Sequence, residues 1–359
     1  MSEIYFLTRY DRSGASSRVR CYDYIDSIRD ELIKQTFQEH PFYTSGYIDF
    51  LYSANYYSWF KQVIRTLYVL NGLLSRLSLL FKIKKGDTVY IEKEVIPYLP
   101  MILEKIYLRR LFGCFIIYDF DDNIFEYYRG NYLLNMLSYD KKFLPRMFAH
   151  KVIAGSPFFG ELLELQLELE LIYSTFKTNN TLAKHSTNTS SLIGWIGSPS
   201  SMYNLEVIIE SIKKLKDRRF LFCGISRELF IKKFGFAPSS NIEFLEWTKE
   251  NEDMFFQRID FGIMPLRDDI FEHFKCGYKI IQYYSRGIPA LVSPVGINIH
   301  LVNHLSDGIY VEDNKWFDTL LNIESMDYSR YSLNAGTQYE SKYSWDSQFK
   351  LWKEAVLQN

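Results

Sequence analysis

Two lysines and a glycine near residue 277 have the types and spacing of an anion-binding site. In KCGYK, at residues 275–279, Lys275 and Lys279 stand on either side of Gly277 and Tyr278. Gly277 opens a predicted helix, and the first turn of a helix leaves backbone amides without partners. Cations beside such amides can bind an anion, most simply a phosphate group. The alternative is an exposed helix start that binds no ligand.

A second group of this kind follows the first apolar segment of the chain. Residues 4–7 predict a buried strand, and the small residues that begin at Gly14 lead into a segment with helical spacing. Arg18 and Arg20 add positive charge at the start of that helix. The loop lacks the GxGxxG pattern of dinucleotide-binding proteins. We expect Gly14 and Arg18 to contact a ligand; alternatively, the glycine only makes the turn and the arginines are solvated.

Three carboxylates, Asp119, Asp121 and Asp122, follow another predicted strand at residues 115–118. A parallel strand delivers the residues after its carboxyl end to the place where such sheets bind ligands. Asp121 and Asp122 are therefore candidates for a catalytic or substrate-orienting role. The DFD sequence is also similar to the DxD motif that holds a metal-bound nucleotide, and acidic residues of this kind also cap helices or stay solvated.

The candidate site residues can lie close together only if the strands that precede them end at the same edge of a sheet. Residues 260–298 read as strand, loop, helix and strand, which is a βαβ unit. Further strands are predicted at residues 87–91, 151–154, 191–197, 220–223, 242–245 and 309–311, alternating with helical segments. Alternation of this kind predicts doubly wound parallel sheets. The polar residues 177–191 lack periodicity and predict a linker between two domains.

Net charge and cysteine spacing indicate which partners and which cellular compartment to expect. The net charge of the 359 residues is -1, with 42 basic and 43 acidic side chains, which argues against a nucleic-acid partner. The four cysteines are far apart and form no CxxC pair, as in a reduced cytoplasmic protein. The first residues are not built like a signal peptide, so we expect a cytoplasmic location.

A long leucine-rich segment carries the one indication of a membrane. Leucines recur at helical spacing between residues 67 and 80, and basic residues lie among and around them between residues 61 and 85. Asn71, Arg76 and several serines interrupt the run, so it does not predict a transmembrane span. Either the helix lies on the inner surface of the plasma membrane, or it is an ordinary helix with a buried face.

Seven segments in this order resemble the retaining glycosyltransferases of group 1, a family of bacterial surface-polysaccharide enzymes. The segments are GASSRVR (14–20), YDFDDNIF (118–125), VIAGSP (152–157), IGWIGSPSS (193–201), DFGIMPL (260–266), KCGYKIIQY (275–283) and GIPALVSPVGIN (287–298). The resemblance spans nearly the whole chain, and its C-terminal series is the most specific part.

The resemblance implies the GT-B fold, in which two Rossmann-like domains face each other across a cleft. Residues 1–180 would form the acceptor-side domain, residues 190–340 the nucleotide-sugar domain, and residues 341–359 a helix that crosses back to the first. The implied reaction moves a hexose from a nucleotide-diphosphate sugar to a glycan or lipid-linked acceptor of a capsule, O-antigen or exopolysaccharide. No metal or other cofactor is expected.

The sequence departs from the family pattern at two places. Much of the family carries two glutamates eight positions apart on the donor helix, where this chain has Phe274 and Gln282. An amide can still bond a ribose hydroxyl, but a phenyl ring cannot bond a sugar. The usual Arg and Lys after the first strand of the second domain are also absent around Gly197. Diphosphate would then be neutralised by Lys275, Lys279 and Arg18.

The expected chemistry follows from charge. Breaking the bond from the anomeric carbon builds negative charge on the leaving phosphate, and cations that stabilise this charge lower the barrier. We assign this role to Lys279, donor binding to Gly14, Arg18, Gly197, Lys275, Gly277, Tyr278 and Gln282, and orientation of acceptor or sugar to Asp121 and Asp122. Two other functions fit the same fold: a nucleotide-sugar epimerase or phosphorylase, and a non-catalytic binding subunit.

Overall fold

A computed structural model describes residues 2–30, 36–52, 58–177 and 191–357. The chain divides into two compact units. Unit 1 contains Met1–Phe176, Phe274–Cys276 and Phe349–Asn359, and unit 2 contains Lys177–His273 and Gly277–Gln348. Nearly all of the predicted linker at residues 177–191 lies outside the described residues, so its conformation stays a prediction.

Unit 1 is built on a six-stranded parallel sheet in the order β2-β1-β3-β4-β5-β6. The strands are β1 (Ile4–Leu7), β2 (Phe37–Glu39), β3 (Thr88–Glu92), β4 (Phe115–Phe120), β5 (Lys151–Ala154) and β6 (Leu169–Leu171). The helices are α1 (Ala15–Ser17), α2 (Asp23–Asp30), α3 (Tyr47–Tyr52), α4 (Ser58–Leu79), α5 (Met101–Arg110), α6 (Phe125–Arg129), α7 (Tyr132–Ser138), α8 (Leu144–Phe148) and α9 (Phe159–Leu162). A π-helical turn, Arg18–Tyr22, joins α1 to α2.

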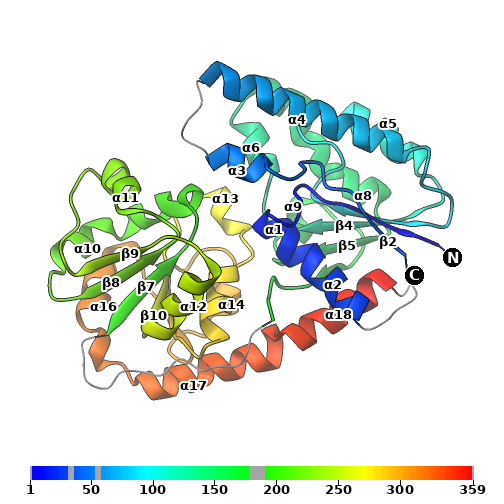
Figure 1. The fold of residues 1–359 in the computed structure, drawn as a ribbon. Helices are drawn as coiled ribbons and strands as arrows, with labels where there is room; N and C mark the ends of the chain where they lie inside the picture. The colour runs from blue at the N-terminus through cyan, green and yellow to red at the C-terminus, as the bar shows by residue number, and fades with distance from the viewer. Residues whose placement is uncertain (1, 31–35, 53–57, 178–190, 358–359) are drawn as a thin grey trace. The chain divides into compact units, whose positions relative to one another are not determined.

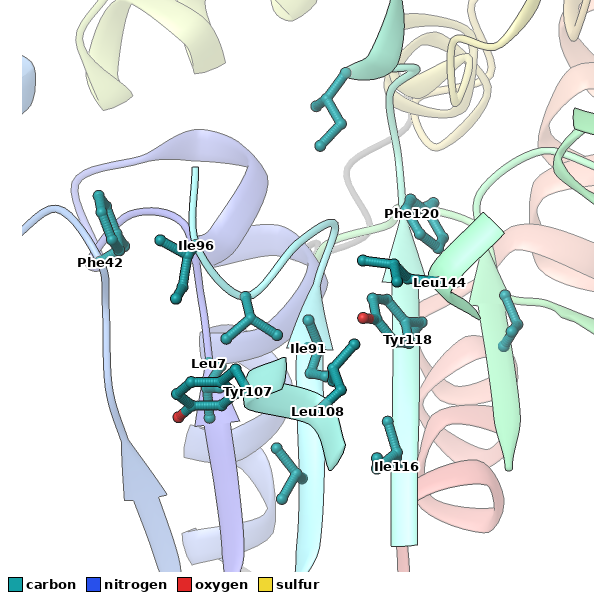
Figure 2. Close-up of a cluster of buried hydrophobic side chains, with 14 of the residues drawn as sticks. Leu7, Phe42, Ile91, Ile96, Tyr107, Leu108, Ile116, Tyr118, Phe120 and Leu144 are labelled. Atoms are coloured by element: carbon teal, nitrogen blue, oxygen red, sulfur yellow. The ribbon is translucent and has the colours of Figure 1, made fainter. Parts of the chain in front are cut away.

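Both faces of this sheet are covered, as the continuous apolar runs of its central strands require. Figure 1 shows α4 and α5 on one side of the sheet and α2 on the other. On the α5 side, alternate residues such as Leu7, Ile91 and Tyr118 pack with Tyr107 and Leu108 (Figure 2). The strands therefore reach a common edge in a fixed register, which sets the positions of the polar residues that follow them.

The opposite face is closed by the C-terminal helix α18 (Trp345–Leu357), which begins in unit 2 and whose residues from Phe349 belong to unit 1. Trp352 is fully buried there, and its ring lies 5.1 Å from that of Tyr24 and 6.0 Å from that of Phe6. A buried tryptophan contributes several kcal/mol of apolar burial. The part of α18 from Phe349 onward thus packs on the sheet of unit 1.

Unit 2 contains a second six-stranded parallel sheet in the order β12-β11-β10-β7-β8-β9. Its strands are β7 (Leu192–Ile196), β8 (Arg219–Cys223), β9 (Ile242–Leu245), β10 (Phe261–Met264), β11 (Ala290–Val292) and β12 (Gly308–Tyr310). Its helices are α10 (Ile209–Lys214), α11 (Arg227–Phe234), α12 (Lys249–Arg258), α13 (Ile270–His273), α14 (Tyr278–Tyr284), α15 (Asn298–Leu301), α16 (Trp316–Leu321) and α17 (Tyr328–Gln338). The prediction of two doubly wound parallel α/β domains is confirmed.

Helix α14 lies close to the second sheet because β10 carries a glycine beneath it. A Cβ atom on Gly262 would lie 2.4 Å from the ring of Tyr283. That tyrosine is fully buried, and its hydroxyl donates to the carbonyl oxygen of Ile263 at 3.2 Å. The contact fixes the height of α14 above the sheet, and with it the start of the helix at Gly277.

Candidate active site

Each sheet has one point where the chain order reverses, and parallel sheets bind ligands beside such points. In unit 1 it lies between β1 and β3, and in unit 2 between β7 and β10. The residues that follow these four strands are therefore the first place to look for chemistry. Gly14 and Arg18 follow β1, Gly197 follows β7, and the residues from Lys275 to Gln282 follow β10, whereas Asp121 and Asp122 follow β4, the neighbour of β3.

In unit 1, Lys93 follows β3 and forms a buried ion pair with Asp121, which follows β4. The Lys93 Nζ atom lies 2.6 Å from the Asp121 carboxylate and donates to the Ser16 hydroxyl at 3.1 Å. Ser16 in turn donates to the other Asp121 oxygen at 2.5 Å. Both charged side chains are at most 7% exposed. Asp121 is thus held in one orientation by two partners.

Lys93 is unusual in two respects: its pKa is raised although the side chain is buried, and its backbone has a positive φ. Burial alone would lower the pKa of Lys93, but the carboxylates of Asp121, Asp122 and Glu92 outweigh it and raise the pKa above its ordinary value. Burial likewise favours neutral Asp121, yet Lys93 and Ser16 lower the pKa of that carboxyl. Lys93 also has a φ of 67°, which non-glycine residues seldom adopt. The ion pair therefore stays charged and holds a strained backbone.

Glu92, the last residue of β3, ties the loop after β1 to the same cluster. Its carboxylate accepts hydrogen bonds from the Ser17 hydroxyl at 2.6 Å and the Arg9 backbone amide at 2.8 Å, and the Ser16 hydroxyl oxygen lies 2.9 Å from it. Burial raises the pKa of this carboxyl. Glu92 and Lys93 were not among the predicted site residues, although their place after a strand next to the reversal point was a usable signal.

Arg20 and Asp119 have structural roles rather than the ligand-facing ones that the sequence indicated. Both side chains are 1% exposed and bond each other through two nitrogens, one of them Nε to Oδ2 at 3.0 Å. The Tyr90 hydroxyl donates to the same carboxylate. The ion pair joins the π-helical turn to β4 beneath the cluster, so neither charge is available to a ligand.

The other predicted residues of unit 1 differ in accessibility. The side chain of Asp122 is 38% exposed and 4.0 Å from Lys93, so it is the more accessible of the two catalytic candidates. Arg18 is half-buried. The Gly14 amide, expected to be available for an anion, already donates to the carbonyl oxygen of Asp11 at 3.0 Å. Lys275 is half-buried in the 274–276 segment, which belongs to unit 1 rather than to unit 2 with Lys279.

Unit 2 places Gly277, Tyr278, Lys279 and Gln282 on or next to α14. Gly277 has a φ of 65°, and a Cβ atom there would lie 2.1 Å from Leu301, so this position requires glycine. The Gly277 amide donates to no group in the part of the chain that the structure describes. Lys279 lies over the Trp195 ring of β7, with Nζ 5.7 Å from the ring centre. Helix α14 thus carries its lysine to the end of the strand beside the reversal point.

Gln282 and Phe274, which stand where much of the family has glutamates, have different surroundings. Gln282 is 4% exposed, and its backbone carbonyl oxygen accepts a hydrogen bond from the Ser285 hydroxyl at 2.7 Å. Phe274 belongs to the core of unit 1, with its ring 5.4 Å from that of Phe159. Phe274 therefore packs in an apolar core, and a bond from Gln282 to a ribose hydroxyl stays a prediction.

Gly197, at the end of β7, closes the strand rather than offering a free amide. Its N–H donates to the Cys223 carbonyl oxygen at 3.0 Å. Nearby, Glu272 is fully buried and accepts a hydrogen bond from Asn204 at 2.9 Å and one from the Tyr203 hydroxyl. These three residues were not predicted; they surround the loop after β10 at the reversal point of unit 2.

Within residues 2–30, 36–52, 58–177 and 191–357, no three His, Cys, Asp or Glu side chains are grouped so that they could hold a metal ion. The two aspartates of the DFD segment instead form separate ion pairs: Asp119 with Arg20, and Asp121 with Lys93. Catalysis without a metal stays a prediction.

Comparisons with known proteins agree with this architecture. Residues 190–323 match the model of the family described as Glycosyl transferases group 1. HepE of Anabaena, solved in complex with UDP-glucose, has a TM-score of 0.69 at 14% identity, with 100% of both chains covered. Sucrose-phosphate synthase from Thermosynechococcus elongatus has a TM-score of 0.68 at 11% identity, covering 100% of this chain and 99% of that one. A glycosyltransferase from Rickettsia africae has a TM-score of 0.60 at 14% identity, with the same coverage.

At these identities the solved structures establish the fold. A comparison with curated protein sequences gave no match. The family model, by contrast, matches the sequence itself and covers the whole second sheet, including α14 and the loop after β10. The matching domain and the shared two-sheet fold identify the chain as a glycosyltransferase with the GT-B fold.

Proposed function

We propose that this glycosyltransferase takes its sugar from a nucleoside diphosphate sugar bound by unit 2. The observation that carries the proposal is the set of groups on α14. One cation, Lys279, lies at the end of β7, the amide of Gly277 begins the helix, and Gln282, 4% exposed, lies on the same helix. HepE, which shares the fold, was solved with UDP and with UDP-glucose.

The groups on α14 match the parts of such a donor. A lysine and a backbone amide stabilise the charge of a diphosphate, and a side-chain amide can both donate to and accept from a ribose hydroxyl. As the bond from the anomeric carbon breaks, charge builds on the leaving phosphate, and Lys279 stabilises it more in the transition state than in the ground state. Gln282 binds the donor equally in both states.

We further propose that the reaction retains the anomeric configuration and needs no metal. The leaving phosphate then assists the acceptor hydroxyl on the same face of the sugar, as the resemblance to the retaining family implies. In unit 1, the exposed carboxylate of Asp122 is the candidate for contact with the acceptor. Asp121 positions the loop through its buried pair with Lys93.

The proposed acceptor is a glycan or lipid-linked intermediate in the biosynthesis of a capsule, O-antigen or exopolysaccharide. Purified protein would be incubated with radiolabelled UDP-, GDP-, ADP- and dTDP-sugars, separately, together with a bacterial lipid extract. Label that moves into the lipid or glycan fraction, with release of the nucleoside diphosphate, supports the proposal. Conversion of a donor without any acceptor, or binding without turnover, would overturn it.

A further inference from the structure

The outer face of α4 carries a continuous apolar stripe that the core of unit 1 does not use. The residues are Val63, Leu67, Leu70, Leu74 and Leu77 on the helix and Phe81 in the turn after it, spaced by three or four positions. All are exposed, Leu74 to 68% and Phe81 to 91%. The buried side of the helix is formed by other residues, such as Gly72, Arg76 and Leu79. Helix α4 therefore has two apolar sides, and only one of them faces the protein.

Helix α5 extends this surface. The Tyr107 hydroxyl donates to the Arg76 carbonyl oxygen at 3.0 Å, which places α5 beside α4. The segments after the two helices are joined by a hydrogen bond from the Gly86 amide to the Gly113 carbonyl oxygen at 2.8 Å. The outward side chains of α5 and its following turn are again exposed and apolar: Ile102, Leu103, Ile106 and Phe112. We call residues 59–86 and 101–113 the α4–α5 face.

The charges on the α4–α5 face are of one sign. Residues 58–86 contain no Asp or Glu, and the one acid in residues 101–113, Glu104, is buried and paired with Lys141 at 2.9 Å. The exposed cations are Arg65, Lys82, Lys84, Lys85, Arg109 and Arg110. One of them, Lys85, lies 5.7 Å from the ring centre of the exposed Phe112, so charge and apolar surface are interleaved.

From this combination we propose that the α4–α5 face binds a lipid surface that contains anionic headgroups. An apolar stripe with basic residues around it enters the headgroup region with its apolar side and attracts anionic lipids with its charges. Among the described residues, no helix combines the length and apolar character that crossing a membrane requires. Contact along the helix is therefore the mode that fits. The proposal does not rest on the donor site of unit 2.

A second copy of the chain fits this face less well. Pairing two α4–α5 faces would bring the exposed cations of both copies together, with no carboxylate from either segment to offset them. The spacing of the stripe would suit a partner helix, but only one with acidic residues along its edges. The membrane requires no such partner, and these other occupants become outcomes of the test.

The test is flotation with vesicles of phosphatidylcholine, with and without phosphatidylglycerol. We expect the protein to float with the anionic vesicles and only weakly with the neutral ones. Replacing Leu67, Leu74 and Phe81 by glutamate should lower the affinity for anionic vesicles at least about 100-fold. Charge reversal of Lys82, Lys84 and Lys85 should lower it by about 100-fold and abolish the difference between the two vesicle types.

Matched control variants lie in unit 2. Glutamate at the exposed positions Leu229, Ile299 and Leu333, or charge reversal of the exposed Lys214, Lys232 and Lys315, should leave flotation unchanged. Trp59, 66% exposed at the start of α4, gives a direct signal. Its emission should shift to the blue on addition of anionic vesicles, and the shift should be absent in the W59F variant.

Three results would overturn the proposal. The first is equal flotation of the wild type and the L67E/L74E/F81E variant. The second is no binding of the wild type to anionic vesicles. The third is a stable dimer that the glutamate variant dissociates and that does not bind vesicles, because the face would then join two copies. Transfer activity with a water-soluble acceptor should persist in both lysine and leucine variants, which separates this proposal from that of the donor site.

Discussion

Replacing Lys93 by methionine should destabilise unit 1 by about 3–5 kcal/mol, because it leaves the buried Asp121 carboxylate without its cation. Lys93 and Asp121 are 2.6 Å apart, with side chains 5% and 7% exposed. Methionine has a similar length and, like lysine, a Cβ atom, so the strained φ of 67° is unchanged by the substitution. The loss can therefore be attributed to the charge.

The magnitude can be isolated with a double-mutant cycle. Asp121→Asn alone leaves Lys93 near Asp122, which is 4.0 Å away, so its cost should be smaller, at about 2 kcal/mol. In the double variant the charges are removed together, and we expect a coupling free energy of about 2 kcal/mol or more. Urea unfolding followed by circular dichroism measures each corner of the cycle.

An exposed ion pair of the same unit provides the control. Arg146 and Glu164 are 2.7 Å apart, but their side chains are 41% and 54% exposed. Arg146→Met should cost less than about 1 kcal/mol, since solvent already screens the pair. The reasoning is refuted if Lys93→Met costs no more than this control, or if the Lys93 and Asp121 substitutions are additive within about 0.5 kcal/mol.

Three further predictions concern the frame around the sites. Arg76→Ala should destabilise the protein by about 3–5 kcal/mol and Arg76→Lys by less, because the buried guanidinium donates to three carbonyl oxygens, those of Thr8, His40 and Val95, at 2.5–2.9 Å. Urea unfolding measures both losses, and equal, small losses would contradict this prediction. Burial, with Arg76 and Lys82 nearby, lowers the pKa of His40 from 6.5 to about 4. As the pH falls through 6.5, the unfolded state binds a proton at His40 and the folded state does not, so the free energy of unfolding decreases. Between pH 7 and 5 the wild type should therefore lose about 1 kcal/mol more stability than the His40→Gln variant. Identical losses in the two proteins would refute this prediction. Gly262→Ala should weaken binding of the donor found active in the panel at least about tenfold in calorimetry, because a Cβ atom 2.4 Å from the Tyr283 ring must displace α14. Unchanged affinity would show that α14 does not hold the donor.

The central strands could be predicted because apolar runs such as residues 115–118 and 260–266 are buried on both faces. Strands β2 and β6 were missed because each has three half-buried residues at a sheet edge and shows no periodic signal. Helix α4 was predicted, but its leucines were equally compatible with a buried face. The structure places Leu67 and Leu74 in solvent and turns Arg76 inward, since the helix packs on Gly72 and Leu79 instead.

The candidate sites were predictable where one segment contains the whole signal, as in α14 with Gly277 and Lys279. They were not predictable where partners are distant in sequence. Arg20 and Asp119 are 99 positions apart, and each alone reads as a free charge at a strand end. The same holds for Lys93, whose role depends on Asp121 and on a backbone conformation that a sequence does not display.

Turnover of the Lys279→Ala variant tests the central claim most directly. With the donor found active in the panel at saturating concentration, the initial rate of sugar transfer would be compared among wild type, Lys279→Ala, Lys279→Arg and the exposed control Lys214→Ala. If Lys279 stabilises the leaving phosphate, kcat falls at least about 100-fold in Lys279→Ala, recovers partly with arginine, and is unchanged in the control. A Lys279→Ala variant that folds normally and transfers sugar at the wild-type rate would contradict the assignment of unit 2 as the donor site.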